Sequence, residues 1–247
     1  MPVTLDGRAA DFESRFSTLL GAKREVSADV DEVVAAILDV VRTRGDAALA
    51  EYTQRFDRVD VATQGLAISR AEVASAFDAC DRRALEALEL AHARVTDYHR
   101  RQAPQDVAFV DELGVELGWR WRPIAAVGLY VPGGAASYPS SVVMNAVPAK
   151  VAGCARIAMV VPTPDGRINP LVLAAARISG IDEIYRIGGA QAIAALAYGT
   201  KTIRPVFKIV GPGNAYVAAA KRRVFGLVGI DMIAGPSEVV EIGRAHV

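Results

Sequence analysis

Residues 123–134 read PIAAVGLYVPGG, an apolar run that ends in a Pro-Gly-Gly turn. Four further apolar runs follow, and helical segments separate them. Nearly continuous apolar strands alternating with helices are typical of a parallel sheet whose two faces are both covered by helices. We therefore expect one doubly wound α/β domain over residues 123–236. Its expected strands are 124–131, 156–161, 183–187, 206–210 and 227–230, and its expected helices are 140–153, 169–179, 190–199 and 214–225.

The first 122 residues have a different pattern, with apolar residues at helical spacing among many charges. Ser27 is a candidate N-cap for a helix that Gly45 ends, and Ser69 can cap a helix over 70–79. Further helices are expected over 46–56 and from 85 to 101, and a hairpin over 107–122, with its turn at 111–114. We expect an acidic, mainly helical N-terminal region that is a separate domain or part of one.

The 247 residues include 28 basic and 28 acidic side chains, so the formal net charge is zero. Residues 1–118 carry 14 basic and 22 acidic side chains, whereas residues 119–247 carry 14 basic and 6 acidic ones. The basic half suits an anionic small molecule. Because the basic half has Lys and Arg in a run only at residues 221–223, we expect no nucleic-acid partner. No apolar stretch approaches a membrane span and residues 1–8 do not read as a signal peptide, so we expect a cytoplasmic protein without a membrane partner.

Three Gly-rich turns join an expected strand to the next helix, at residues 131–134, 187–191 and 211–214. In an open α/β sheet, ligands bind beyond the carboxyl ends of the strands. Glycines at a helix N-terminus let backbone N–H groups approach a phosphate, although they also serve simply to make a tight turn. Three such turns at one edge favour an anionic ligand.

The dinucleotide fingerprint GxGxxG is absent, because Tyr216 occupies the third glycine position after Gly211 and Gly213. Tyr130 ends the first strand and could stack on a ring or fill a rim. Gln191 and Asn214 stand at the starts of their helices, where an amide could reach a ligand or cap the helix. These alternatives remain open from the residues alone.

No residue pattern assigns a catalytic group or a metal ligand. His92 and His99 lie seven residues apart without an acidic or cysteine partner at ligand spacing, which favours a solvated helix face. Cys80 and Cys154 are not spaced as CxxC, so no structural disulfide is expected. Cys154 follows Gly153 in an apolar run with no evident base, which favours packing over a nucleophilic role.

Several blocks together resemble the histidinol dehydrogenase family, in order and at the family's spacing. The helical half contributes VRTRGD (41–46) and EYTQRFD (51–57). The other blocks are residues 122–134, 138–153, IGGAQA (187–192), KIVGPGNAYV (208–217) and DMIAGPSE (231–238). The resemblance covers nearly the whole chain up to Val240.

The resemblance implies two successive NAD-dependent oxidations of L-histidinol, through L-histidinaldehyde, to L-histidine. It also implies a zinc ion that orients the substrate, a cytoplasmic homodimer, and a Rossmann-like core without the usual fingerprint. In the family pattern Tyr130, Gln191 and Asn214 match the NAD contacts, and Ser237 matches a substrate contact.

The match breaks after Val240, where the family continues for nearly as much chain again and carries its zinc ligands and proton acceptors. Residues 237–240 would begin the return to the first domain. We expect the Rossmann-like sheet of this chain to be incomplete. Residues 241–247, EIGRAHV, read as a translated sequencing adapter, so we expect a non-native tail and an inactive chain. The alternatives are another NAD-linked alcohol or aldehyde dehydrogenase and a non-enzymatic nucleotide-binding module.

Overall fold

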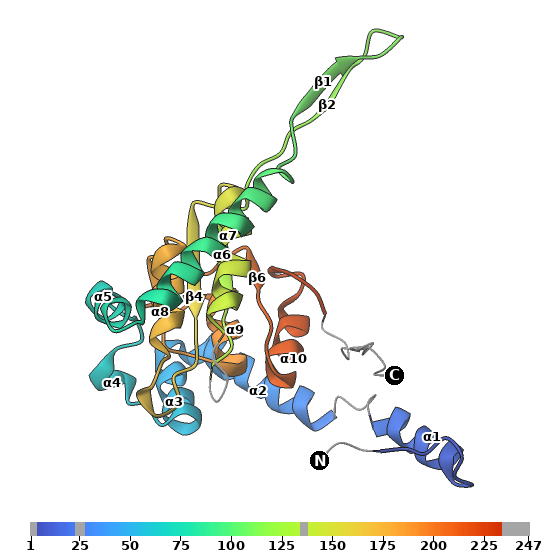
Figure 1. Ribbon diagram of the computed structural model, residues 1–247, viewed down its shortest axis with the longest axis vertical. Helices are drawn as coiled ribbons and strands as arrows, with labels where there is room; N and C mark the ends of the chain where they lie inside the picture. The colour runs from blue at the N-terminus through green and yellow to red at the C-terminus, as the bar shows by residue number, and fades with distance from the viewer. Residues whose placement is uncertain (1–3, 23–27, 134–137, 234–247) are drawn as a thin grey trace, which may run out of the picture.

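The computed structural model describes residues 4–22, 28–133 and 138–233 (Figure 1). Its main sheet has five parallel strands in the order β5-β4-β3-β6-β7. This is the doubly wound order, because the chain builds outward from β3 to one edge and then returns to build toward the other. The expected α/β class is confirmed. The strands are β3 (Ala126–Tyr130), β4 (Arg156–Val160), β5 (Glu183–Tyr185), β6 (Lys208–Val210) and β7 (Gly229–Ile230).

Successive residues of each strand enter opposite cores. Ala126 and Tyr130 of β3 belong to one hydrophobic cluster, whereas Val127 and Leu129 belong to the other. This period of two follows from the pleat of a strand, and it explains why the strands read as unbroken apolar runs. Helices α9 (Gly189–Tyr198) and α10 (Ala215–Val224) cover the first face, and α7 (Pro139–Val151) and α8 (Pro170–Ile178) cover the second.

Helices from the first half of the chain add an outer layer on both faces. Helices α2 (Ala28–Arg44) and α3 (Asp46–Asp57) join the core of α9 and α10. Helices α5 (Arg70–Asp78) and α6 (Arg82–Arg100) pack against α8 and α7. Ser69 and Glu72 form the capping box that begins α5, as the sequence predicts for Ser69. Ser27 lies outside the described residues.

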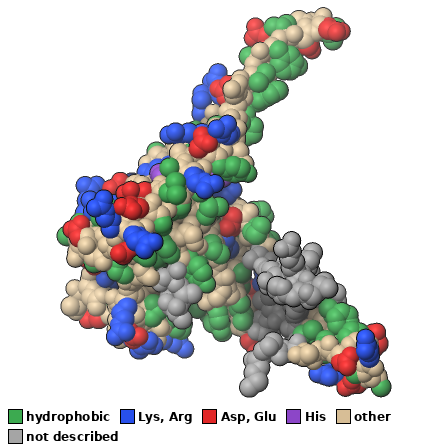
Figure 2. Space-filling view, viewed as in Figure 1, with side chains coloured by type: hydrophobic (Ala, Val, Ile, Leu, Met, Phe, Trp, Pro, Cys, Tyr) green, Lys and Arg blue, Asp and Glu red, His purple; other side chains and the backbone are tan. Residues whose placement is uncertain are grey.

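The predicted hairpin is present as β1 (Val107–Val110) and β2 (Glu116–Trp119), and it projects from the body of the molecule (Figures 1 and 2). Its side chains are mostly exposed, including Phe109 and Trp119, whose rings meet edge to face. Strand β2 is shorter than predicted because residues 120–122 continue without a strand partner among the described residues.

Three short elements were not predicted. Helix α1 (Phe12–Ala22) has Phe12 and Phe16 stacked one turn apart, a spacing that is typical of a helix. Helix α4 (Val61–Gln64) and the 3-10 turn η1 (Pro164–Gly166) are too short to show a period. Among the described residues, no helix is long and apolar enough to cross a membrane. Residues 237–247, including Ser237 and the expected tail, lie outside the described part of the chain.

Candidate functional site

A cleft of about 1090 Å³ opens at the carboxyl ends of β3 and β6, the point where the strand order reverses. All three Gly-rich turns line it, through Gly133, Gly188 with Gly189, and Gly213. The expectation that these turns meet at one edge is therefore confirmed. Such a switch point is where doubly wound folds bind their ligands. Tyr130, Gln191 and Asn214 all line the same cleft.

Tyr130 ends β3 and is only 4% exposed, so its ring is a wall of the cleft rather than a rim. Its hydroxyl oxygen accepts a hydrogen bond of 3.1 Å from the backbone N–H of Gly189. Burial is the main reason why the pKa of Tyr130 is raised. The contact fixes the first turn of α9 against the end of β3.

Gln191 stands in the first turn of α9 and is 2% exposed. Among the described residues, its Oε1 has no hydrogen-bond partner. A buried acceptor without a donor lowers the stability of the folded protein. Such an atom is usually paired with a group that the protein alone does not supply, for example a bound ligand or a water molecule. No hydrogen bond from Gln191 Oε1 caps α9, so the capping alternative is not supported, and the ligand contact stays a prediction.

Asn214 is the N-cap of α10. Its Oδ1 accepts a hydrogen bond of 3.1 Å from the backbone N–H of Val217. Asn214 is exposed and lines the cleft. It therefore caps α10 and is also part of the cleft wall.

The turn after β6 is held by an ion pair between the buried Lys221 and the more exposed Asp231, which the sequence did not suggest. Gly211 has φ +117°, and a Cβ at this position would lie 2.1 Å from the carbonyl oxygen of Tyr130. The Gly211 N–H donates to Asp231 Oδ2 (2.9 Å), and its carbonyl accepts from Lys221 Nζ (3.0 Å). Lys221 and Asp231 also pair with each other. Both polar groups of the Gly211 peptide are therefore fixed.

Asp57 is the other residue that sequence reasoning passed over. It ends α3, lines the cleft and is 7% exposed. Its Oδ2 accepts a hydrogen bond of 3.3 Å from the backbone N–H of Thr163. Burial raises the pKa of Asp57, partly opposed by that hydrogen bond. Asp57 is part of the block EYTQRFD, but nothing in the sequence links it to a turn more than a hundred residues later.

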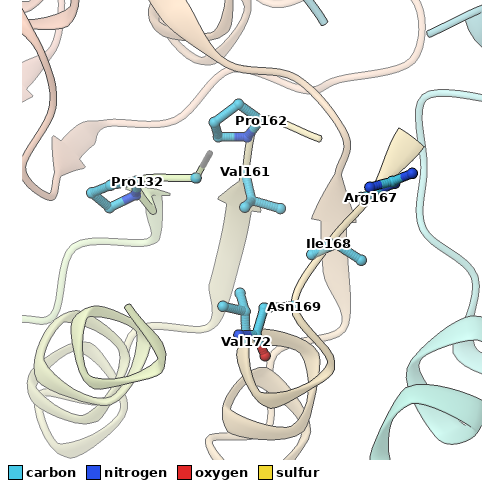
Figure 3. A pocket seen from close by; sticks show the side chains of 8 residues that line it. Pro132, Val161, Pro162, Arg167, Ile168, Asn169 and Val172 are labelled. Atoms are coloured by element: carbon cyan, nitrogen blue, oxygen red, sulfur yellow. The ribbon is translucent and has the colours of Figure 1, made fainter. Parts of the chain in front are cut away.

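A smaller hollow of about 250 Å³ adjoins the cleft on the side of α8 (Figure 3). The two share Pro132, Gly133 and Pro162. Arg167 and Asn169 also line the hollow, and Asn169 caps α8 by accepting from the Leu171 N–H (2.9 Å). The hollow therefore extends the same binding edge and adds one cationic side chain to it.

In the described ranges, no group of three or more His, Cys, Asp or Glu side chains is arranged to hold a metal ion. Cys80 and Cys154 are free and half-buried, and burial raises the pKa of both thiols. A raised pKa disfavours the thiolate that a nucleophilic cysteine requires. Cys154 packs against the core of α7 and α8, as predicted.

Comparison with known proteins gives a consistent result. The family model described as histidinol dehydrogenase matches residues 21–245. The chain is 66% identical, over 242 residues, to the histidinol dehydrogenases of Bradyrhizobium diazoefficiens and Ruegeria pomeroyi, covering 98% of this chain and 56% of each relative. It therefore spans about half the length of these curated relatives.

A solved structure supports the same assignment. The crystal structure of histidinol dehydrogenase from Elizabethkingia anophelis matches with a TM-score of 0.82 and 35% identity, covering 91% of this chain and 52% of that one. Sequence and fold agree over the region that builds the cleft. The chain belongs to the histidinol dehydrogenase family.

Proposed function

We propose that this chain forms the nucleotide-binding part of an NAD-dependent histidinol dehydrogenase. The longer protein would oxidise L-histidinol through L-histidinaldehyde to L-histidine, the last steps of histidine biosynthesis. The observation that carries the proposal is the convergence of Tyr130, Gln191 and Asn214 on one cleft at the switch point of the sheet. The family assignment supplies the reaction.

The residues present fit a dinucleotide. Only glycine fits in two of the turns, because a Cβ at Gly188 would lie 2.4 Å from Pro162 Cβ and one at Gly213 would lie 2.3 Å from Val217 Cγ1. Gln191 Oε1 supplies a buried acceptor for a hydroxyl or amide donor of the ligand. When bound, NAD supplies the acceptor for a hydride from the alcohol and then from the aldehyde.

In this proposal, each of these cleft residues contacts the dinucleotide or positions a turn that contacts it. The Tyr130 ring forms a flat apolar wall, and its hydroxyl keeps Gly189 in place. Asn214 presents the start of α10, whose N-terminal dipole favours an anionic group. Ser237 is proposed as a substrate contact, although it lies outside the described residues.

The described residues offer no zinc site, and we assign zinc to the longer protein without any ligand from them. We also propose that the longer protein is a cytoplasmic homodimer. Residues 1–122 would belong to a domain that further chain completes, and residues 123–236 would form the NAD-binding domain.

Calorimetric titration of the purified chain with NAD⁺, together with an assay for NADH production from L-histidinol and added Zn²⁺, tests the proposal. We expect saturable NAD⁺ binding without turnover, because the resemblance implies that the family's zinc ligands and proton acceptors follow the matched segments. A folded chain that does not bind NAD⁺ would overturn the cofactor assignment. NADH production near that of a full-length relative would overturn the expected inactivity.

A further inference from the structure

In doubly wound dinucleotide folds, an acidic residue at the end of the second strand accepts a hydrogen bond from the ribose 2′-hydroxyl. The second strand here is β4, and the residues after it are Val161, Pro162 and Thr163. The first acidic residue that follows is Asp165. Its carboxylate is bound by the Arg58 guanidinium through two hydrogen bonds, and it does not line the cleft. The expected acid is therefore missing from the segment that normally supplies it.

Helix α3 brings a carboxyl group to the same place. Asp57, its last residue, is held at the end of β4 by the backbone N–H of Thr163, which donates to Oδ2. The Arg58–Asp165 pair, from the adjacent residue, ties the end of α3 to η1. The carboxyl is thus fixed at the strand end although it comes from another part of the chain.

The carboxyl is available to a ligand in the cleft. Among the described residues, Oδ1 of Asp57 receives no hydrogen bond, and Asp57 lines the cleft with Gln191. Gln191 Oε1, also without a donor there, is an independent sign that a ligand with hydrogen-bond donors binds. Two acceptors on residues that line one cleft match the hydroxyl groups of a ribose.

Two cations lie near the carboxyl. Arg58 is already occupied by Asp165. Arg55 lines the cleft, and its guanidinium carbon lies 5.4 Å from the centre of the Phe56 ring. Neither forms an ion pair with Asp57, so the carboxylate is not neutralised by a bound cation among the described residues.

We propose that Asp57 accepts a hydrogen bond from a ribose 2′-hydroxyl of the bound dinucleotide and thereby selects NAD over NADP. In NADP the 2′ oxygen carries a phosphate, which has no matching donor and would meet the carboxylate at close range. Like charges in such a position are strongly repulsive. This inference rests on the proposed function.

The test compares the dissociation constants of NAD⁺ and NADP⁺ for the wild-type chain and for Asp57→Asn. Asparagine keeps the size of the side chain and an oxygen for the Thr163 N–H, so the fold is preserved. We expect the ratio of the NADP⁺ constant to the NAD⁺ constant to fall about tenfold or more, since one like charge is removed. Asp57→Glu is the second variant, and it should retain a preference for NAD⁺.

The matched control is Asp60→Asn, which removes the same charge three residues away. Asp60 caps α4 through the Ala62 N–H, asparagine caps equally well, and Asp60 does not line the cleft. This variant should leave the ratio unchanged. If Asp57→Asn binds NAD⁺ with the wild-type ratio, the inference is wrong and the proposed function stands. If the folded wild-type chain binds neither nucleotide, both are wrong.

Discussion

At the scale of single residues, Gln191 allows an effect on ligand binding to be measured apart from an effect on stability. Gln191 fills the start of α9 with its Oε1 unsatisfied by any described residue, whereas its neighbours on that helix are alanine, isoleucine and leucine. A side chain chosen only for packing would be apolar at this position. The amide is therefore expected to lower the stability of the free chain, and the proposed ligand contact would account for its presence.

We predict that Gln191→Leu leaves the free energy of unfolding unchanged or raises it by about 1 kcal/mol, because a buried unpaired acceptor is removed. The same change should weaken NAD⁺ binding about tenfold or more, the loss expected when a hydrogen bond to the ligand is deleted. Thermal or urea denaturation and calorimetric titration measure the two effects.

Ser179 is the matched control for Gln191. Its Oγ is also buried without a partner among the described residues, but it lies at the end of α8 and does not line the cleft. Ser179→Ala should give a similar change in stability with unchanged NAD⁺ affinity. Equal loss of binding in both variants would show that Gln191 acts only through the fold.

A local sequence pattern predicts the positions of Gln191 and Asn214, but no local pattern predicts that of Asp57. Gln191 and Asn214 follow Gly-rich turns, so their place at the carboxyl edge follows from the strand-helix pattern. Asp57 reaches that edge through the packing of α3, a long-range contact with no local signal. Sequence also left open whether an amide caps its helix. In the structure Asn214 caps its helix, whereas Gln191 Oε1 makes no cap hydrogen bond.

At the scale of elements, the strand ends are joined by charged groups. Glu183 at the start of β5 accepts from Arg156 of β4 and from Arg204. Hydrogen bonding to Arg156 is the main reason why the pKa of Glu183 is lowered. A lowered pKa in the folded state contributes stability above the unfolded pKa, and that contribution is lost as the pH falls through the folded pKa.

We therefore predict that the wild-type chain loses more stability than Glu183→Gln when the pH is lowered from 7 to about 3. At pH 7 the variant should be less stable by about 1–2 kcal/mol, the usual strength of hydrogen bonds to charged groups. Urea denaturation at several pH values measures this difference. Parallel pH curves for the two proteins would contradict the prediction.

The ion pair of Lys221 and Asp231 holds the turn at residues 211–214 through hydrogen bonds to the Gly211 peptide. Asp231→Ala should cost about 1.5–3 kcal/mol, because it removes the charged partner of the buried Lys221 ammonium. In the double variant Lys221→Met with Asp231→Ala the loss should be smaller than the sum of the single losses. Denaturation of all four proteins of this cycle measures the coupling, and additive losses would show that the pair is not coupled.

The same elements show why the strands could be predicted and the supporting pair could not. The apolar strands follow from composition, because both faces of the sheet are covered. Lys221 belongs to a run of three basic residues that reads as a solvated helix end, and Asp231 follows a strand of only two residues. Only the folded structure brings these two charges to the Gly211 peptide.

At the scale of the whole molecule, the two unlike halves of the chain share a core. Leu49 of α3 and Ile193 and Leu196 of α9 belong to one hydrophobic cluster. The first half also extends the sheet, since Ala67 forms an antiparallel bridge to Tyr185 at the edge of β5. The acidic and basic halves meet in ion pairs such as that of Asp31 with Arg223. Such exposed pairs contribute little beside the shared apolar core.

We predict that the halves unfold together, so that Leu49→Ala lowers the stability of the nucleotide-binding sheet. Truncating this fully buried side chain should cost about 2–5 kcal/mol. In hydrogen exchange, the amides of Leu129 in β3 and Ile209 in β6 should lose protection by that amount. Leu20→Ala in α1 is the control: that side chain is 46% exposed, and its loss should change stability by no more than about 0.5 kcal/mol. If Leu49→Ala leaves the protection of β3 and β6 intact, the halves are energetically separate, and the shared core does not couple them.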